Sequence, residues 1–176
     1  MNSGEYVRKM IDFYRGNRRD INHFLKVYGF ARTIGECEGL DAATQRVLES
    51  AAIVHDIACP LCREKYGHAD GKLQERESPA LLADFLAGTG LSPAEEARIV
   101  FLVSHHHTYA GVDGPDWQIL LEADYLVNAD EGNAAAAAIG RMRDQVFRTA
   151  TGKALLESVY RDALAGESSV CTKDER

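Results

Sequence analysis

Helical periodicity is the feature that most limits what this chain can fold into. Apolar residues recur three or four positions apart over most of the 176 residues, and only four prolines interrupt the pattern. No alternating apolar and polar segment enriched in β-branched residues is long enough to predict a strand. The sequence therefore predicts an all-α fold, a single-domain helical bundle over residues 1–176 without repeats or a second domain.

Capping and breaking residues divide this periodicity into separate helices. Ser92, Pro93 and Glu95 give the clearest start signal, because they combine an N-cap serine, a proline at the first helical position and a glutamate placed for a capping box. Asp20 is the expected N-cap of the second helix. From these signals we expect helices over residues 5–14, 20–38, 42–57, 73–86, 93–105, 117–128 and 153–164.

Other parts of the chain are less regular. Residues 59–72 contain Pro60, Gly67 and Gly71 and are expected to form a loop with one helical turn. C-terminal helices are expected within 133–164, and the tail 166–176 is expected to be flexible.

The charge balance excludes some classes of partner. The chain has 20 Lys and Arg against 27 Asp and Glu, which gives a formal net charge of −7. Polyanions gain affinity mainly from clustered basic residues, so we expect no nucleic-acid polymer and no membrane as partner. Residues 1–9 lack the apolar stretch of a signal peptide, and we expect a cytoplasmic protein of open oligomeric state.

The four cysteines, at positions 37, 59, 62 and 171, show no regular disulfide spacing. In a protein without an export signal, this spacing predicts reduced thiols. Cys59 and Cys62 form a C-x-x-C pair, which is typical of redox motifs and zinc half-sites. Because no second pair and no βαβ pattern accompany it, we interpret the pair as plain thiols.

Polar residues stand at three places where the periodicity requires apolar ones. His55 and Asp56 end the most hydrophobic predicted helix, three histidines at 105–107 end another, and Asp124 lies inside the apolar segment ILLEADYLV. Taken singly, each has a structural interpretation as a helix end or a solvated charge. Taken together, they predict a site for a divalent ion, and nitrogen with oxygen ligands suits Mn, Fe, Co, Ni, Zn or Mg equally.

These motifs occur in a recognisable order. His23 lies in DINHFLKVYGFARTIG, His55 and Asp56 in AAIVHDIA, the histidine cluster in LVSHHHTY and Asp124 in ILLEADYLVN. Over residues 21–131 the chain resembles the HD-domain superfamily of metal-dependent phosphohydrolases. The resemblance implies an HD-type helical fold in which His23, His55, Asp56 and Asp124 bind one metal ion.

The resemblance also implies a second metal ion in some relatives. His106 and His107 match the histidine motifs of dinuclear members, and the segment QERES supplies a carboxylate. Glu77 stands where some of those relatives carry a histidine, so its part in a second site departs from the family pattern.

The implied reaction is hydrolysis of a small phosphorylated substrate, for which we expect a nucleotide or a related phosphoester. A bound divalent ion polarises the phosphoryl group and acidifies a water molecule. Asp56 is also the candidate catalytic residue, as the group that orients this water. Lys65, Lys72 and Arg76 are candidates for binding substrate phosphate, although the interpretation as solvated surface charges is the favoured one.

Two other functions remain open at this stage. Some relatives with a dinuclear site are di-iron oxygenases, which need two iron ions in close contact. The third hypothesis is a non-catalytic module that binds a metal or a nucleotide, which predicts stabilisation by the ligand without product formation.

Overall fold

Ten helices make up the regular structure of residues 1–170, the part of the chain that the computed structural model describes. No strand occurs among these residues, so the predicted all-α class is confirmed. In chain order the helices are α1 (Ser3–Tyr14), α2 (Arg18–Glu38), α3 (Ala42–Val54), α4 (Cys59–Tyr66), α5 (Gly71–Leu86), α6 (Pro93–Val103), α7 (Pro115–Glu131), α8 (Ala136–Gln145), α9 (Ala150–Val159) and α10 (Arg161–Val170).

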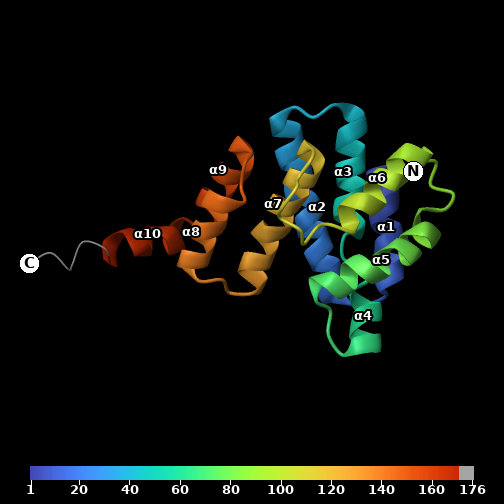
Figure 1. Cartoon of the computed structure of the whole chain (residues 1–176), viewed down its shortest axis with the longest axis horizontal. Coiled ribbons are helices and arrows are strands. Elements are labelled where there is room, and N and C mark those ends of the chain that lie inside the picture. Colours follow the sequence, from blue (N-terminus) through green and yellow to red (C-terminus); the bar gives the residue numbers. More distant parts are fainter. Residues whose placement is uncertain (171–176) are drawn as a thin grey trace, which may run out of the picture.

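The centre of the molecule is formed by α2, α3 and α7 (Figure 1). Helix α2 packs against both α3 and α7, while α1 and α6 pack against α3. Fully buried side chains fill the space between them, among them Phe24, Leu48, Ile53 and Leu120. This core fixes the relative positions of α2, which carries His23, of α3, which His55 follows, and of α7, which carries Asp124. Within residues 1–170, none of the helices has the length and apolar character that crossing a membrane requires.

Helix α4 corrects the expectation of a loop over 59–72. Pro60 lies in the first turn, where a missing N–H costs no intrahelical hydrogen bond, and Gly67 ends the helix with φ 78°. The residues that suggested a loop are thus the start and stop signals of a two-turn helix.

Several predicted helix ends also differ from the structure. Helix α2 begins after Asn17, whose side chain accepts a hydrogen bond from Asp20 N at 3.3 Å, so Asp20 is in the first turn and is not the N-cap. Helix α3 stops at Val54 rather than at residue 57, and α6 stops at Val103. Both early stops leave the histidine motifs in turns that follow the helices.

The C-terminal helix expected over 153–164 is in fact two helices. They are separated at Tyr160, whose hydroxyl donates to the carbonyl of Leu126 at 2.6 Å. Helix α10 continues to Val170 and so includes the first residues of the tail expected over 166–176, while residues 171–176 lie outside the described part. Figure 1 shows α8, α9 and α10 on the side of the molecule opposite α1 and α5.

A buried carboxylate connects this C-terminal part to the core. Glu122 on α7 is fully buried and accepts hydrogen bonds from Arg148 N at 2.6 Å and Thr149 N at 3.0 Å. It also accepts from Gln118 Nε2 at 2.7 Å and from the Thr149 hydroxyl. One side chain therefore satisfies the backbone donors at the start of α9, where a helix has no partners of its own.

The predicted capping box of α6 forms as expected. Ser92 accepts from Glu95 N at 3.3 Å, and Glu95 accepts from Ser92 N at 2.8 Å. Hydrogen bonds from Ser92 and the guanidinium of Arg46 lower the pKa of Glu95 to about 2, so its carboxylate form favours the folded state. This stabilisation is complete above about pH 4.5, the ordinary pKa of glutamic acid, and is lost as pH falls toward 2.

We therefore expect Glu95→Gln to lower the melting temperature at neutral pH, and we expect this difference to shrink between pH 4.5 and pH 2. Thermal unfolding of both proteins followed by circular dichroism across this range measures the effect. If the two melting temperatures differ by the same amount at pH 7 and at pH 2.5, the carboxylate of Glu95 does not stabilise the fold through its charge.

Candidate metal centre

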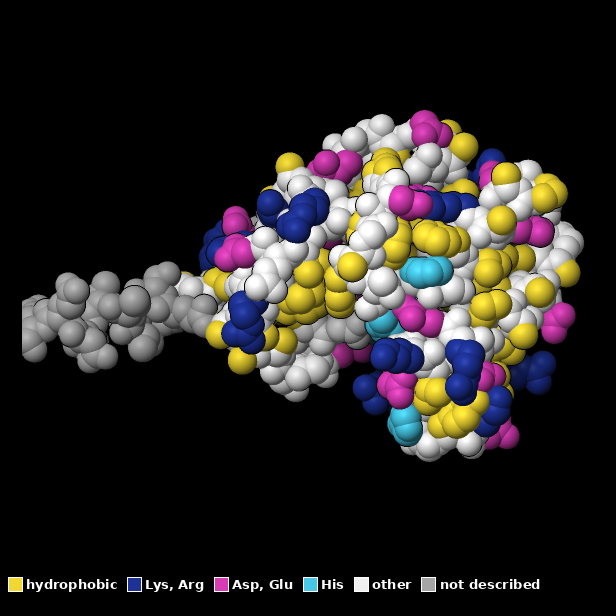
Figure 2. Space-filling model, viewed as in Figure 1, with side chains coloured by type: hydrophobic (Ala, Val, Ile, Leu, Met, Phe, Trp, Pro, Cys, Tyr) yellow, Lys and Arg dark blue, Asp and Glu magenta, His cyan; other side chains and the backbone are white. Residues whose placement is uncertain are grey.

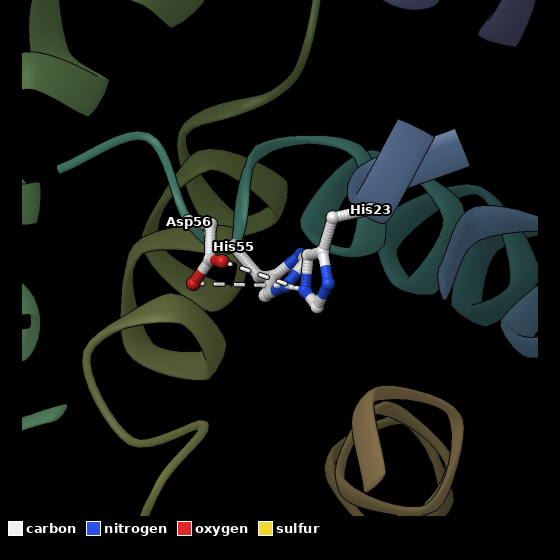
Figure 3. Close-up of side chains that lie close together, drawn as sticks. All are labelled: His23, His55 and Asp56. Atoms are coloured by element: carbon white, nitrogen blue, oxygen red, sulfur yellow. Dashed lines mark hydrogen bonds and ion pairs between the residues drawn. The ribbon is translucent and has the colours of Figure 1, made fainter. Parts of the chain in front are cut away.

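Four side chains predicted from the sequence meet at one point in the core. His23 comes from α2, His55 and Asp56 from the turn after α3, and Asp124 from α7. His23 Nε2 lies 3.1 Å from His55 Nε2, and Oδ1 of Asp124 lies 3.4 Å from each of these nitrogens. Asp56 Oδ2 lies 3.4 Å from His23 Nε2, and Figure 3 shows this carboxylate facing the two imidazoles.

The early end of α3 explains how two adjacent residues reach the same point. His55 and Asp56 lie in the turn that links α3 to α4, where Cys59 N donates to Asp56 O at 2.9 Å. The same carbonyl accepts a hydrogen bond from the Tyr14 hydroxyl at 2.8 Å. Helix α1 and the turn thus hold the backbone of Asp56 in place.

Outer hydrogen bonds set the orientation of the imidazoles. Nδ1 of His55 lies 2.8 Å from the carbonyl of Ala52, and Nδ1 of His106 lies 2.6 Å from the carbonyl of Val103. A carbonyl only accepts, so both Nδ1 atoms carry a proton and Nε2 of each ring is directed toward the site. Nδ1 of His23 faces the carboxylate of Glu131 at 3.1 Å in the same manner.

The residues at this point fit a divalent cation. Oδ1 of Asp124 and Nε2 of His106 are buried without a hydrogen-bond partner. Buried acceptors that face one another without a donor are costly, and a cation or a proton between them removes that cost. His23, His55 and Asp56 each offer a ligand atom within 4.8 Å of the others, and imidazole with carboxylate is a common donor set for divalent metals.

The charges around the imidazoles support the same conclusion. Burial lowers the pKa of His23, but Asp124, Asp56 and Glu131 outweigh burial and raise this pKa to about 9. The pKa of Asp124 is depressed because the adjacent imidazoles of His23 and His55 outweigh burial, which alone would raise it. Without a metal, the site therefore binds a proton, so metal uptake is expected to release it.

A second group of ligand atoms lies beside the first. Asp56, His106 and His107 offer atoms within 4.8 Å of one another, and Asp56 Oδ1 is 3.5 Å from His106 Nε2. Burial lowers the pKa of His107 to about 4, so this ring is neutral at physiological pH. Asp56 thus belongs to both groups. His105 lies apart, stacked on Phe101 with its Nδ1 2.7 Å from the Phe101 carbonyl.

The remaining predicted site residues lie away from these atoms. Glu77 on α5 pairs with Lys65 at 3.2 Å and accepts from the Tyr66 hydroxyl at 2.7 Å, and it is absent from the ligand groups found within residues 1–170. Arg76 pairs with Glu77 as well, at 3.2 Å. Lys72 lines a separate depression next to His107. Another carboxylate near the second group is that of Glu75, which accepts hydrogen bonds from His107 N at 3.4 Å and from the Thr108 hydroxyl at 3.1 Å.

Three charged residues near the centre were not identified from the sequence. Glu131 contacts His23, while Arg19 and Arg63 line the cleft that opens beside His23 and Asp56. A signal was present for two of them: Arg19 precedes His23 by four residues and Glu131 follows Asp124 by seven, so each shares a helix face with a predicted ligand.

Cys59 and Cys62 are buried in α4 and free, as is the exposed Cys37. Burial is the largest cause that raises the pKa of both C-x-x-C thiols, so neither is a reactive thiolate at neutral pH.

Gly71, at the start of α5, makes room for His107. A Cβ atom at this position would lie 2.5 Å from Cδ2 of the His107 ring. We expect Gly71→Ala to displace the ring and to lower the free energy of unfolding by about 1–3 kcal/mol, as overpacking typically does. Urea denaturation measures this loss. Gly29→Ala in α2 is the matched control, because a Cβ there meets no atom within 4 Å; equal stability of both variants contradicts the prediction.

Comparisons of the chain with family models, with curated proteins and with solved structures give no match.

Proposed function

We propose that this chain is an HD-type metal-dependent phosphohydrolase acting on a small phosphorylated molecule. The observation that carries the proposal is the convergence of the two imidazoles of His23 and His55 with the carboxylates of Asp56 and Asp124, where Oδ1 of Asp124 is buried without a hydrogen-bond partner. Such a centre beside a cleft with two arginines combines the requirements of phosphoester hydrolysis. The ordered motifs of the sequence support the same family.

His23, His55, Asp56 and Asp124 would hold the ion. When bound, a divalent ion supplies positive charge for a phosphoryl oxygen and acidity for a water molecule. Glu131 keeps the His23 ring oriented through Nδ1, and Lys26 keeps Glu131 in place through an ion pair at 3.0 Å.

The reaction forms a bond from a water oxygen to phosphorus and breaks the bond from phosphorus to the ester oxygen, which leaves as an alcohol after taking a proton. Asp56 is the residue we propose to orient the water. Its side chain is 21% exposed, whereas that of Asp124 is 5% exposed, so a water in the cleft reaches Asp56 first. Its low pKa, which His55 and His106 hold down against burial, suits a hydrogen-bond acceptor better than a strong base.

The group of Asp56, His106 and His107 favours a second candidate, a dinuclear oxygenase. This function requires two iron ions per chain. Metal analysis after reconstitution with iron distinguishes the oxygenase from the hydrolase. One iron ion per chain excludes the oxygenase and is compatible with the hydrolase.

Metal-stripped protein reloaded separately with Mn, Fe, Co, Ni, Zn or Mg tests the hydrolase. We expect release of inorganic phosphate from at least one compound in a panel of nucleotides, sugar phosphates and other phosphomonoesters. Metal binding without phosphate release under any combination contradicts the enzyme and supports a binding module, whose ligands would raise the melting temperature without being consumed.

A further inference from the structure

The residues that line the cleft beside the candidate metal centre limit the chemical class of ligand that it can bind. It measures about 320 Å³ and receives residues from α2, α4, α5 and α7. His23 and Asp56 lie at its buried end, while Arg19, Arg63 and His68 are more exposed. Figure 2 shows basic, acidic and histidine side chains close together on the lower part of the face in view.

Two arginines supply the positive charge of the cleft. Arg63 on α4 pairs with Asp20, which is 8% exposed and also accepts a hydrogen bond from Asn17 Nδ2 at 2.7 Å. This pair holds the guanidinium at the cleft while leaving most of its five donors unused. Arg19 is exposed and forms no ion pair with the other residues of the described chain. Arginine binds phosphate oxygens in a planar, two-pronged geometry, so these side chains suit a phosphate group.

The charge of the cleft also fits an anion once a metal is bound. Asp20, Asp56 and Glu131 line it, so three carboxylates face two arginines in the metal-free protein. A divalent ion at the centre adds positive charge next to these arginines and offsets the carboxylates. An anionic ligand is therefore expected to bind far better to the metal-loaded protein.

The rest of the lining is polar and lacks aromatic rings other than histidine. Among the described residues around the cleft there is no Phe, Tyr or Trp, which are the side chains on which nucleobases usually stack. Gln74 and Asn128 line it instead, and Oε1 of Gln74 is buried without a hydrogen-bond partner. The side-chain amides of Gln74 and Asn128 carry both donors and acceptors, which suit a ligand hydroxyl.

We infer that the cleft takes the phosphomonoester of a small hydroxylated compound, such as a sugar phosphate, and makes no use of a nucleobase. Arg19 and Arg63 contact the phosphate oxygens, and Gln74 accepts a hydrogen bond from a hydroxyl of the organic part. This inference rests on the proposed hydrolase and narrows its substrate to a class other than the nucleotides expected from the sequence.

Ribose 5-phosphate and adenosine 5′-monophosphate form the decisive pair of probes, because they share the ribose phosphate and differ at C1, where one has a hydroxyl and the other the base. With metal-loaded protein we expect the two compounds to bind within about threefold of each other and to have similar kcat/KM values. Binding is measured by the shift in melting temperature with ligand concentration, which does not depend on turnover. A preference of tenfold or more for the nucleotide overturns the inference but leaves the hydrolase standing.

The arginines are tested with inorganic phosphate as the probe. We expect Arg19→Gln and Arg63→Lys each to weaken phosphate binding by about tenfold, since each removes hydrogen bonds between charged groups. Lysine at position 63 keeps the charge that Asp20 needs, so the fold is preserved. Arg32→Gln is the control, because Arg32 is exposed on α2 and pairs with Glu36 at 2.8 Å outside the cleft.

These results test the phosphate subsite and the hydrolase activity separately. Wild-type protein that phosphate does not stabilise, or arginine variants that bind phosphate like the wild type, overturn the subsite whatever the enzyme does. Protein that binds phosphate through both arginines, yet takes up no metal and hydrolyses nothing, overturns the hydrolase while the subsite stands.

Discussion

Asp124→Asn is expected to reduce metal affinity and phosphate release by more than about 100-fold. Losing a residue that only supports a metal ligand costs 10–100-fold, and Asp124 is placed as a ligand itself. The amide has nearly the same shape as the carboxylate but lacks its charge, and its Nδ2 turns a donor toward the lone pairs of His23 and His55. Metal titration by calorimetry measures the affinity, and a phosphate-release assay measures the rate.

Asp130→Asn is the matched control on the same helix. Asp130 has a side chain that is 70% exposed, and its nearest basic partner is Lys26 at 3.9 Å. This variant is expected to bind metal like the wild type. Circular dichroism is used to check that both variants keep their helices. An Asp124→Asn protein that is folded and binds metal like the wild type would contradict the proposed metal centre.

Glu122→Ala is expected to lower the free energy of unfolding by about 3 kcal/mol. Its removal leaves the backbone donors of Arg148 and Thr149 without their acceptor, while Gln118 Nε2 keeps the carbonyl of Val146 at 2.8 Å. Glu122→Gln keeps one acceptor oxygen and is expected to lose about half as much. Urea denaturation of both variants gives these values.

Glu157→Ala is the control for this stability measurement. Its carboxylate is on α9, is 58% exposed and lies 3.9 Å from Arg143, so we expect a change within about 0.5 kcal/mol. If Glu122→Ala is as stable as Glu157→Ala, the carboxylate does not hold α9 to the core.

The sequence predicts the all-α class well because helix start signals are local. Ser92 and Glu95 cap α6 as expected, since both partners lie within one turn of the chain. The helix ends near the histidines are harder to predict from the sequence. The apolar periodicity of α3 continues beyond His55, although the helix itself ends at Val54. Such a stop depends on tertiary contacts, among them the bond from Tyr14 to Asp56 O.

The candidate site shows the same division between local and long-range information. His23, His55, Asp56 and Asp124 are polar residues in apolar surroundings, which marks them in the sequence. Arg63 carries no such mark, because its importance comes from a contact with Asp20 across 43 residues. The position of Glu77 in a motif makes it a candidate ligand. In the structure its carboxylate interacts instead with Lys65, Tyr66 and Arg76.

One carboxylate, Asp56, lies between the two groups of candidate ligands. Its Oδ2 faces His23 while its Oδ1 faces His106, so occupancy on one side reshapes the other through a single rigid side chain. Two ions would therefore bind interdependently, because both would use this carboxylate. Dissecting them requires changes at His23 or His107, each of which belongs to one group alone.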